Sequence, residues 1–170
     1  MAVFFDTGVL YALHDRADSR HLDAAAISFH ALTGKWGSPY TSNYVTIETT
    51  LLLKSRLGWG SARRFPASAR RMGLKELVVD EESHAKALEM FEGGKRDLSL
   101  TDAVTLLLVN SLVIGTLATF DRRSFARIKE TVVGAGYATS LTDKERNRVA
   151  ELENDASHSL SSNNKARRAT

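Results

Sequence analysis

The chain has 170 residues, of which 43% are hydrophobic and 25% are charged, and it contains no cysteine. This length predicts a single domain with a proper hydrophobic core. The lack of cysteine excludes disulfides, thiolate zinc sites and cysteine nucleophiles, and it fits the reducing environment of the cytoplasm. A secretory signal is not expected, because Asp6 interrupts the apolar run at the N-terminus.

The formal net charge of +3 is concentrated at one end of the chain. Residues 157–170 contain Lys165, Arg167 and Arg168 and no acidic residue. The other 20 basic residues balance the 20 acidic ones, so residues 1–156 are neutral. Global charge therefore identifies no partner, and local patterns have to be examined instead.

Residues 103–120 form an uncharged stretch that is almost long enough to cross a bilayer. The stretch contains several threonines and other polar residues, and Gly115 would break a helix within it. It therefore predicts a buried helix followed by a buried strand, and we expect no association with a membrane.

Short apolar runs alternate with segments of helical periodicity along the chain. The runs predict strands at Ala2–Phe5, Trp36–Thr41, Leu77–Val79 and Thr116–Thr119. Apolar spacing and capping residues predict helices at Gly8–Leu13, His21–Leu32, Ser42 to about Arg56, Ser61–Met72, Asp80 to about Phe91, Asp102–Leu112, and briefly after Asp121. Pro66 argues against the first turns of its helix. The alternation indicates an α/β fold with a parallel sheet covered on both faces.

The C-terminal part has a weaker pattern. Thr142 and Glu145 have the spacing of a capping box, which predicts a helix within 142–155. Residues 156–170 are rich in serine and asparagine and contain few apolar side chains, so we expect a disordered tail.

Two carboxylates stand at the ends of predicted strands. Asp6 follows the first apolar run, and Asp121 follows the strand that begins at Thr116. Because sites in open parallel sheets form outside the carboxyl ends of the strands, these two side chains should reach the same edge.

Two further acids stand in unusual places. Asp102 opens a helix, where a plain role in stabilising the helix N-terminus is the alternative. Glu48 is the one charge in the apolar and threonine-rich stretch Tyr44–Leu53 of its helix, so it lies either at the edge of the buried stripe or beside a partner. Carboxylates gather only around a cation, because like charges raise each other's pKa. Ligand sets made of oxygen suit Mg²⁺ or Mn²⁺, which orient a phosphodiester and activate water.

Common phosphate-binding, hydrolase and zinc motifs are absent from the sequence. The histidines are scattered. His14 and His21 are seven residues apart and could share a helix face, but packing or surface roles are the default interpretation.

Four segments taken in order resemble the motifs of PIN-domain ribonucleases, and among these the VapC toxins of toxin–antitoxin pairs. The resemblance covers roughly residues 2–128, and the segments are Val3–Leu10, Tyr40–Thr49, Asp97–Ala103 and Leu117–Phe125. It implies a PIN-like three-layer fold in residues 1–141, with a central parallel sheet flanked by helices.

The resemblance also implies roles for individual residues. Asp6, Asp102 and Asp121 would bind Mg²⁺ or Mn²⁺ directly or through water, and Glu48 would complete a catalytic acidic pocket. Thr7 and Thr101 match small hydroxyl positions that could support a carboxylate or a water. The implied reaction is hydrolysis of RNA phosphodiester bonds, leaving 5′-phosphate and 3′-hydroxyl ends. A cognate antitoxin and a homodimer are the implied protein partners.

An acidic pocket repels RNA, so such a nuclease needs basic residues around it. No acid occurs between Glu48 and Glu76, and the segment is rich in arginine and lysine. The expected RNA contacts are Arg56, Arg63, Arg64, Arg122 and Arg123. The alternative is an ordinary solvated helix face. Trp59 could stack on a base, or it could contact the core or a partner.

Three other functions stay open at this point. A stand-alone RNA-processing PIN nuclease and a non-catalytic PIN-like binding module share the same motifs. A haloacid-dehalogenase-like phosphatase also carries an aspartate after its first strand. That family usually has a second acid where this chain has Gly8, and a paired acid where Arg122 follows Asp121.

Overall fold

The computed structural model describes residues 1–94, 98–126 and 128–154. Asp97 of the third motif and the tail expected at 156–170 lie outside this range. The five strands are all parallel and follow the order β3-β2-β1-β4-β5. Their bounds are β1 (Ala2–Phe5), β2 (Ser38–Ser42), β3 (Lys75–Leu77), β4 (Thr116–Ala118) and β5 (Thr131–Val133).

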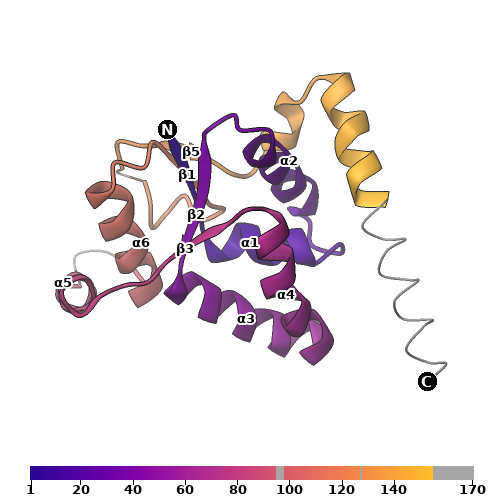
Figure 1. Ribbon diagram of the computed structural model, residues 1–170. Helices are drawn as coiled ribbons and strands as arrows, with labels where there is room; N and C mark the ends of the chain where they lie inside the picture. The colour runs from indigo at the N-terminus through magenta and orange to yellow at the C-terminus, as the bar shows by residue number, and fades with distance from the viewer. Residues whose placement is uncertain (95–97, 127, 155–170) are drawn as a thin grey trace.

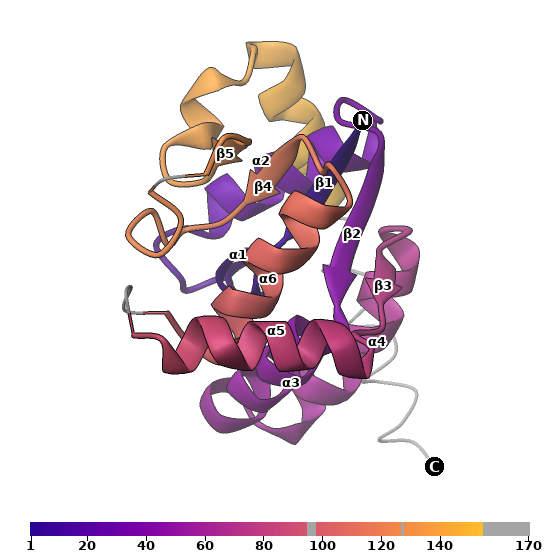
Figure 2. The same cartoon turned by 90° about the vertical axis from the view of Figure 1, so that its left-hand side faces the viewer.

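Helices cover both faces of this sheet. In Figure 1, α5 and α6 lie on one side of the strands and α1 and α2 on the other, and Figure 2 shows α5 crossing in front of α6 and the sheet. The expected three-layer α/β fold is confirmed. The helices are α1 (Thr7–His14), α2 (His21–Leu32), α3 (Asn43–Leu57), α4 (Trp59–Arg71), α5 (Glu81–Glu92) and α6 (Leu100–Ser111), with a 3-10 turn at Tyr137–Ser140.

The central strand β1 organises the core. Val3, Phe4 and Phe5 are completely buried, as expected for a parallel strand covered on both faces. Each such side chain contributes about 1.5–3 kcal/mol through burial. The register pairs Phe5 with Ala118 of β4, and the Asp6 N–H donates to the Ala118 carbonyl at 3.0 Å. The two strands therefore end at the same level, and the residues after Phe5 and Ala118 emerge at the same edge of the sheet.

Several boundaries differ from those expected. Strand β5 was not expected because its three residues give little pattern, and β3 begins two residues before the predicted Leu77. Helix α4 begins at Trp59 and contains Pro66, so the prediction from Pro66 against its first turns is wrong. The short helix predicted after Asp121 is wrong.

A turn replaces that helix. The Asp121 carboxylate accepts hydrogen bonds from the N–H groups of Arg123 and Ser124, at 2.9 and 3.0 Å. The carboxylate thus binds the first N–H groups as an N-cap would, but residues 122–126 form turns and no helix continues through them.

A last helix spans residues 143–154 and packs against α2. Thr142 and Glu145 form the expected capping box, because each side chain accepts from the other's backbone N–H. Two histidines of α2 hold this helix. His30 Nε2 lies 2.9 Å from Glu145 Oε1, and His21 Nε2 lies 2.6 Å from Glu153 Oε2. We call these two contacts the His–Glu seam.

The uncharged stretch 103–120 divides as expected. It forms the buried part of α6 and, after Gly115, the buried strand β4. Among the residues that the structure describes, no helix has the length and apolar character needed to cross a membrane.

Candidate active site

Four carboxylates surround one pocket at the carboxyl edge of the sheet. Asp6 follows β1, Asp121 follows β4, Asp102 lies in the first turn of α6, and Glu48 projects from α3. The pocket has a volume of about 510 Å³ and is lined by Asp6, Thr7, Gly8, Arg20, Glu48, Ser99, Asp102, Phe120 and Asp121. The sequence hypothesis required these four acids to converge, and the structure places them together.

Asp6 is the buried member of this group. Its side chain caps α1 by accepting from the Thr7 N–H at 2.8 Å, and it accepts from the Thr119 hydroxyl at 2.7 Å. Burial raises the pKa of Asp6 to about 7, against the lowering effect of those two hydrogen bonds. The negative charges of Asp102 and Glu48 raise the pKa further.

Glu48 is half-buried and is oriented by Thr7. The Thr7 hydroxyl donates to Glu48 Oε2 at 2.6 Å. Thr7 therefore binds one carboxylate with its backbone and another with its side chain. This supporting position is the one that the resemblance implied for Thr7.

Asp102 has a capping role as well as a place in the pocket. Its carboxylate accepts from the Ser99 N–H at 2.8 Å, and its own N–H donates to the Ser99 hydroxyl at 3.0 Å. The same side chain therefore caps the helix and lines the pocket. Thr101 lies one residue earlier and lines the neighbouring groove on α3, beside Glu48 and Leu52, rather than the acidic pocket.

Asp121 lies in a largely exposed turn. Burial is the largest single influence on its pKa and raises it, but the hydrogen bonds from Ser124 and the Arg123 N–H together outweigh burial and lower the pKa. The Ser124 hydroxyl donates to Asp121 Oδ2 at 2.7 Å. The pocket therefore combines a carboxylate that resists ionisation with one that ionises readily.

Thr119 joins these two carboxylates and was missed in the sequence analysis as a site residue. Its buried hydroxyl donates to Asp6 and accepts from the Asp121 N–H at 3.0 Å. Close packing fixes its backbone, since a Cβ on Gly134 would lie 2.1 Å from the Thr119 carbonyl oxygen. A hydroxyl residue between a strand end and a motif acid was the signal that could have identified it.

Arg20 and Phe120 also line the pocket without having been expected there. The Arg20 guanidinium lies over the Phe120 ring, 5.3 Å from its centroid. Phe120 belonged to a recognised motif, whereas nothing in the sequence around Arg20 indicated that α2 begins at the pocket.

The donor set is compatible with a hard divalent cation. Among residues 1–94, 98–126 and 128–154, no three His, Cys, Asp or Glu side chains lie close enough to form a ready-made metal cluster. Magnesium usually keeps several waters and uses one or two carboxylates of the protein. Oxygen ligands around an open pocket therefore fit Mg²⁺ or Mn²⁺ bound partly through water.

The arginines expected to bind RNA lie outside the pocket itself. Arg56 lies in the last turn of α3, and Arg63 and Arg64 are exposed on α4. Arg122 and Arg123 are exposed in the turn after Asp121. Trp59 is 65% exposed, so it is not a core residue.

The histidines of the first two helices have packing roles. The ring of His14 packs edge-on against Phe65, and its Nδ1 bonds to the Leu10 carbonyl oxygen at 2.8 Å. His21 Nδ1 bonds to the Ala12 carbonyl oxygen at 2.8 Å. The default interpretation for these residues was therefore the appropriate one.

Comparisons with known proteins agree with this architecture. The family model described as "PIN domain" matches residues 3–131. A VapC ribonuclease of Archaeoglobus fulgidus is 30% identical over 160 residues, which is 89% of this chain and 95% of that protein.

Two solved structures are also similar. Mycobacterium tuberculosis VapC20, a sarcin-ricin loop cleaving toxin, superposes with a TM-score of 0.64 at 26% identity, over 73% of this chain and 93% of that one. Neisseria gonorrhoeae FitAcB gives a TM-score of 0.57 at 18% identity, over 82% and 99%, and shows likeness of fold. Because the family model spans most of the sheet and all four acids, the chain belongs to the PIN domain family.

Proposed function

We propose that this protein is a Mg²⁺- or Mn²⁺-dependent endoribonuclease and the toxin of a toxin–antitoxin pair. The observation that carries the proposal is the convergence of Asp6, Glu48, Asp102 and Asp121 on one pocket. Burial and neighbouring acids raise the pKa of Asp6 to about 7. Such a raised pKa is expected where carboxylates gather in a site that binds a cation. The similarity to a VapC ribonuclease and to a toxin that cleaves RNA supports the choice of substrate.

The residues divide into ligands and the groups that orient them. Asp6, Asp102 and Asp121 would hold the cation, and Glu48 would complete the pocket. When bound, Mg²⁺ or Mn²⁺ lowers the pKa of a water and neutralises charge on a phosphodiester. Thr119, Ser99 and Ser124 fix the three aspartates by hydrogen bonds. Such supporting contacts keep ligands in a productive geometry before substrate arrives.

Hydrolysis would leave 5′-phosphate and 3′-hydroxyl ends. Thr7 keeps Glu48 at the pocket through a 2.6 Å hydrogen bond, where the carboxylate can accept a proton from a water. RNA would approach across the basic positions outside the acids, which are Arg56, Arg63, Arg64, Arg122 and Arg123.

Partners and location follow from the same proposal. A VapC-like toxin acts in the cytoplasm and is controlled by an antitoxin, so we expect a small DNA-binding antitoxin encoded beside this gene. A homodimer is also expected. Ile47 and Leu51 on α3 are 58% and 60% exposed and supply an apolar surface for such a contact. Light scattering would measure the dimer.

Two alternatives have distinct signatures. A stand-alone RNA-processing nuclease would cleave RNA but have no antitoxin gene beside it. A non-catalytic module would bind RNA or protein without cleaving. The phosphatase alternative has lost its support, because the PIN match covers the segments on which it depended.

The decisive experiment compares the intact protein with Asp6→Asn. We expect Mg²⁺- or Mn²⁺-dependent cleavage of RNA by the intact protein, and a loss of at least about 100-fold in the variant, because metal-ion catalysis contributes several kcal/mol. Asp143→Asn is the matched control, since its side chain is 98% exposed on the last helix. Equal cleavage by Asp6→Asn and intact protein would overturn the proposal. Release of phosphate from a small phosphoester with RNA left intact would favour a phosphatase.

A further inference from the structure

Arg20 is the basic residue among the lining of the acidic pocket. The other charged groups of that lining are the four carboxylates. A guanidinium beside four acids would ordinarily form an ion pair. Within the part of the chain that the structure describes, however, no carboxylate lies within ion-pair distance of Arg20. Among the described residues, none accepts a hydrogen bond from its guanidinium either.

The backbone around Arg20 is held in place on both sides. The carboxylate of Asp18 accepts from the Arg20 N–H at 2.8 Å, and that of Asp15 accepts from the Ala17 N–H at 3.0 Å. The next residue, His21, is fixed by the Ala12 carbonyl oxygen and by Glu153. The exposed Arg20 side chain therefore projects from a fixed backbone position at the beginning of α2. This order limits the conformational entropy that is lost when Arg20 binds a ligand.

Phe120 fixes the orientation of the guanidinium. The ring is half-buried against the core and lies beside Gly8, where a Cβ would be 3.7 Å from it. The Arg20 guanidinium lies over this ring, with Cζ 5.3 Å from the ring centroid. A guanidinium held over an aromatic face can donate two parallel hydrogen bonds from its planar fork, a geometry that matches phosphate.

We propose that Arg20 binds a phosphate of the RNA substrate at the mouth of the acidic pocket, with Phe120 orienting its guanidinium. The inference rests on the proposed function. An anionic backbone is repelled by four carboxylates, and a cation that lines their own pocket offsets this repulsion where the reaction occurs. Arg20 is accordingly a substrate-binding residue, distinct from the outlying arginines predicted to contact RNA.

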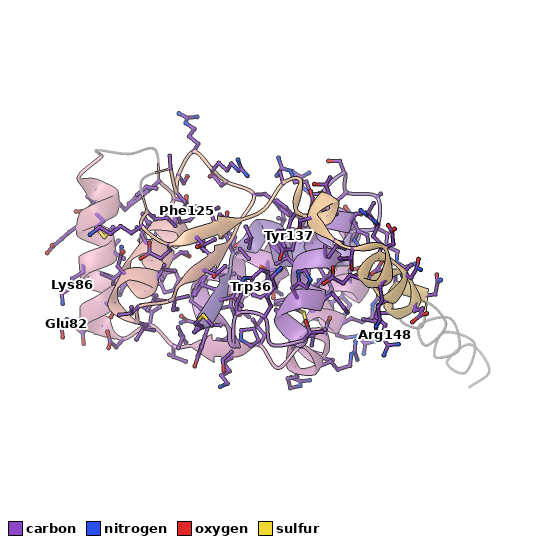
Figure 3. The ribbon with its side chains drawn as sticks, turned by 90° about the horizontal axis from the view of Figure 1, so that it is seen from above. Trp36, Glu82, Lys86, Phe125, Tyr137 and Arg148 are labelled. Atoms are coloured by element: carbon purple, nitrogen blue, oxygen red, sulfur yellow. The ribbon has the colours of Figure 1, made fainter. Side chains whose placement is uncertain are left out.

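The test uses the full chain with Arg20→Ala and Arg20→Lys. Loss of a charge-assisted hydrogen bond predicts a fall in RNA cleavage of about 10- to 100-fold for Arg20→Ala. Arg20→Lys keeps the charge but loses the planar fork, so it should recover only part of the rate. Added guanidinium ion should partly rescue Arg20→Ala and should leave Asp6→Asn inactive. Arg148→Ala is the control. Arg148 does not line the pocket and lies on the last helix, at the opposite end of Figure 3 from Lys86 of α5.

Binding provides a readout that does not need cleavage. In an Asp6→Asn background, fluorescence anisotropy with a labelled single-stranded RNA should show weaker binding for Arg20→Ala, and a salt dependence whose slope falls by about 0.7. Arg20→Lys should keep the slope. If the intact protein does not cleave RNA but this affinity loss occurs, the proposed function fails and the role of Arg20 stands.

Two results would overturn the role of Arg20. One is an Arg20→Ala variant that cleaves and binds RNA like the intact protein while Asp6→Asn is inactive. The other is an Arg20→Ala variant with tighter Mn²⁺ binding and unchanged RNA affinity, since that result would make Arg20 a counter-ion for the acids.

Discussion

The acidic pocket and the His–Glu seam use carboxylates in opposite ways. In the pocket, burial and two neighbouring acids raise the pKa of Asp6 to about 7. In the seam, a hydrogen bond from His30 lowers the pKa of Glu145 to about 2, and one from His21 lowers the pKa of Glu153. Paired carboxylates favour the folded state, whereas gathered carboxylates oppose it until a cation binds. The contrast separates the part of the molecule that holds the fold from the part expected to perform chemistry.

Breaking the seam should give the largest effect on stability. His30 is 4% exposed and contacts both Glu145 and the Tyr137 hydroxyl. We expect His30→Ala to lower the free energy of unfolding by about 3 kcal/mol, because it leaves a cavity and unpaired polar groups. Urea denaturation measures this loss.

The aromatic neighbours of His30 sharpen that expectation. Its ring packs edge-on against Trp36 and Tyr137, which lie next to each other in Figure 3. RNA cleavage below the melting range should stay unchanged in His30→Ala. His84→Ala is the control on α5, with an expected loss of less than about 1 kcal/mol, because that half-buried ring contacts Tyr44 at the surface. An inactive but fully stable His30→Ala would contradict the assignment of the seam to structure.

A change within the pocket should instead lower activity more than stability. Thr119→Val keeps the shape of the side chain and removes the hydroxyl that binds Asp6 and the Asp121 N–H. Loss of such a supporting contact costs about 10- to 100-fold in activity or metal affinity. Initial rates of RNA cleavage and titration with Mn²⁺ would measure both effects.

The control is the same substitution at Thr105 on α6. Thr105 is also fully buried, but its hydroxyl has no hydrogen-bond partner among the described residues. Thr105→Val should therefore leave cleavage unchanged and stabilise the protein by about 1 kcal/mol. If both valine variants lost activity equally, the effect of Thr119→Val would reflect packing and not the orientation of Asp6.

The sequence predicted the pocket better than the seam, for a physical reason. Strand ends and helix starts are local features, so the positions of Asp6, Asp102 and Asp121 followed from apolar runs and caps. The links between them are not local: Thr119 lies 113 residues from Asp6 in the chain. Periodicity along one segment carries no information on such a contact.

Other elements show the same division. The capping box at Thr142 involves residues three apart and was predicted, whereas the partner of His30 is 115 residues away. The turn after Asp121 was mistaken for a helix because the Asp121 side chain binds the following N–H groups as a helix cap does, although no helix continues through residues 122–126. Arg20 was overlooked because its place depends on a non-local contact between the start of α2 and Phe120.

The smallest predicted effect is the pH dependence of the seam. The hydrogen bond that His21 donates to Glu153, against the lowering effect of burial, raises the pKa of His21 above its ordinary value of 6.5. The stabilising contribution of His21 is therefore complete below pH 6.5 and is lost as the pH rises through the raised pKa. Hydrogen bonding to His21 lowers the pKa of Glu153 below 4.5, so that contribution is complete above pH 4.5 and is lost on acidification.

The pair should thus stabilise the fold most between pH 4.5 and 6.5. We expect intact protein to exceed His21→Gln by about 1 kcal/mol in this window, and by less at pH 8 and at pH 3. Arg16 also lies 3.7 Å from Glu153 and retains part of the contact in the variant. Urea denaturation across the pH range measures the difference, with His84→Gln as the control that should show no such window. A difference that does not change with pH would mean that His21 acts through its bond to Ala12 and not through charge.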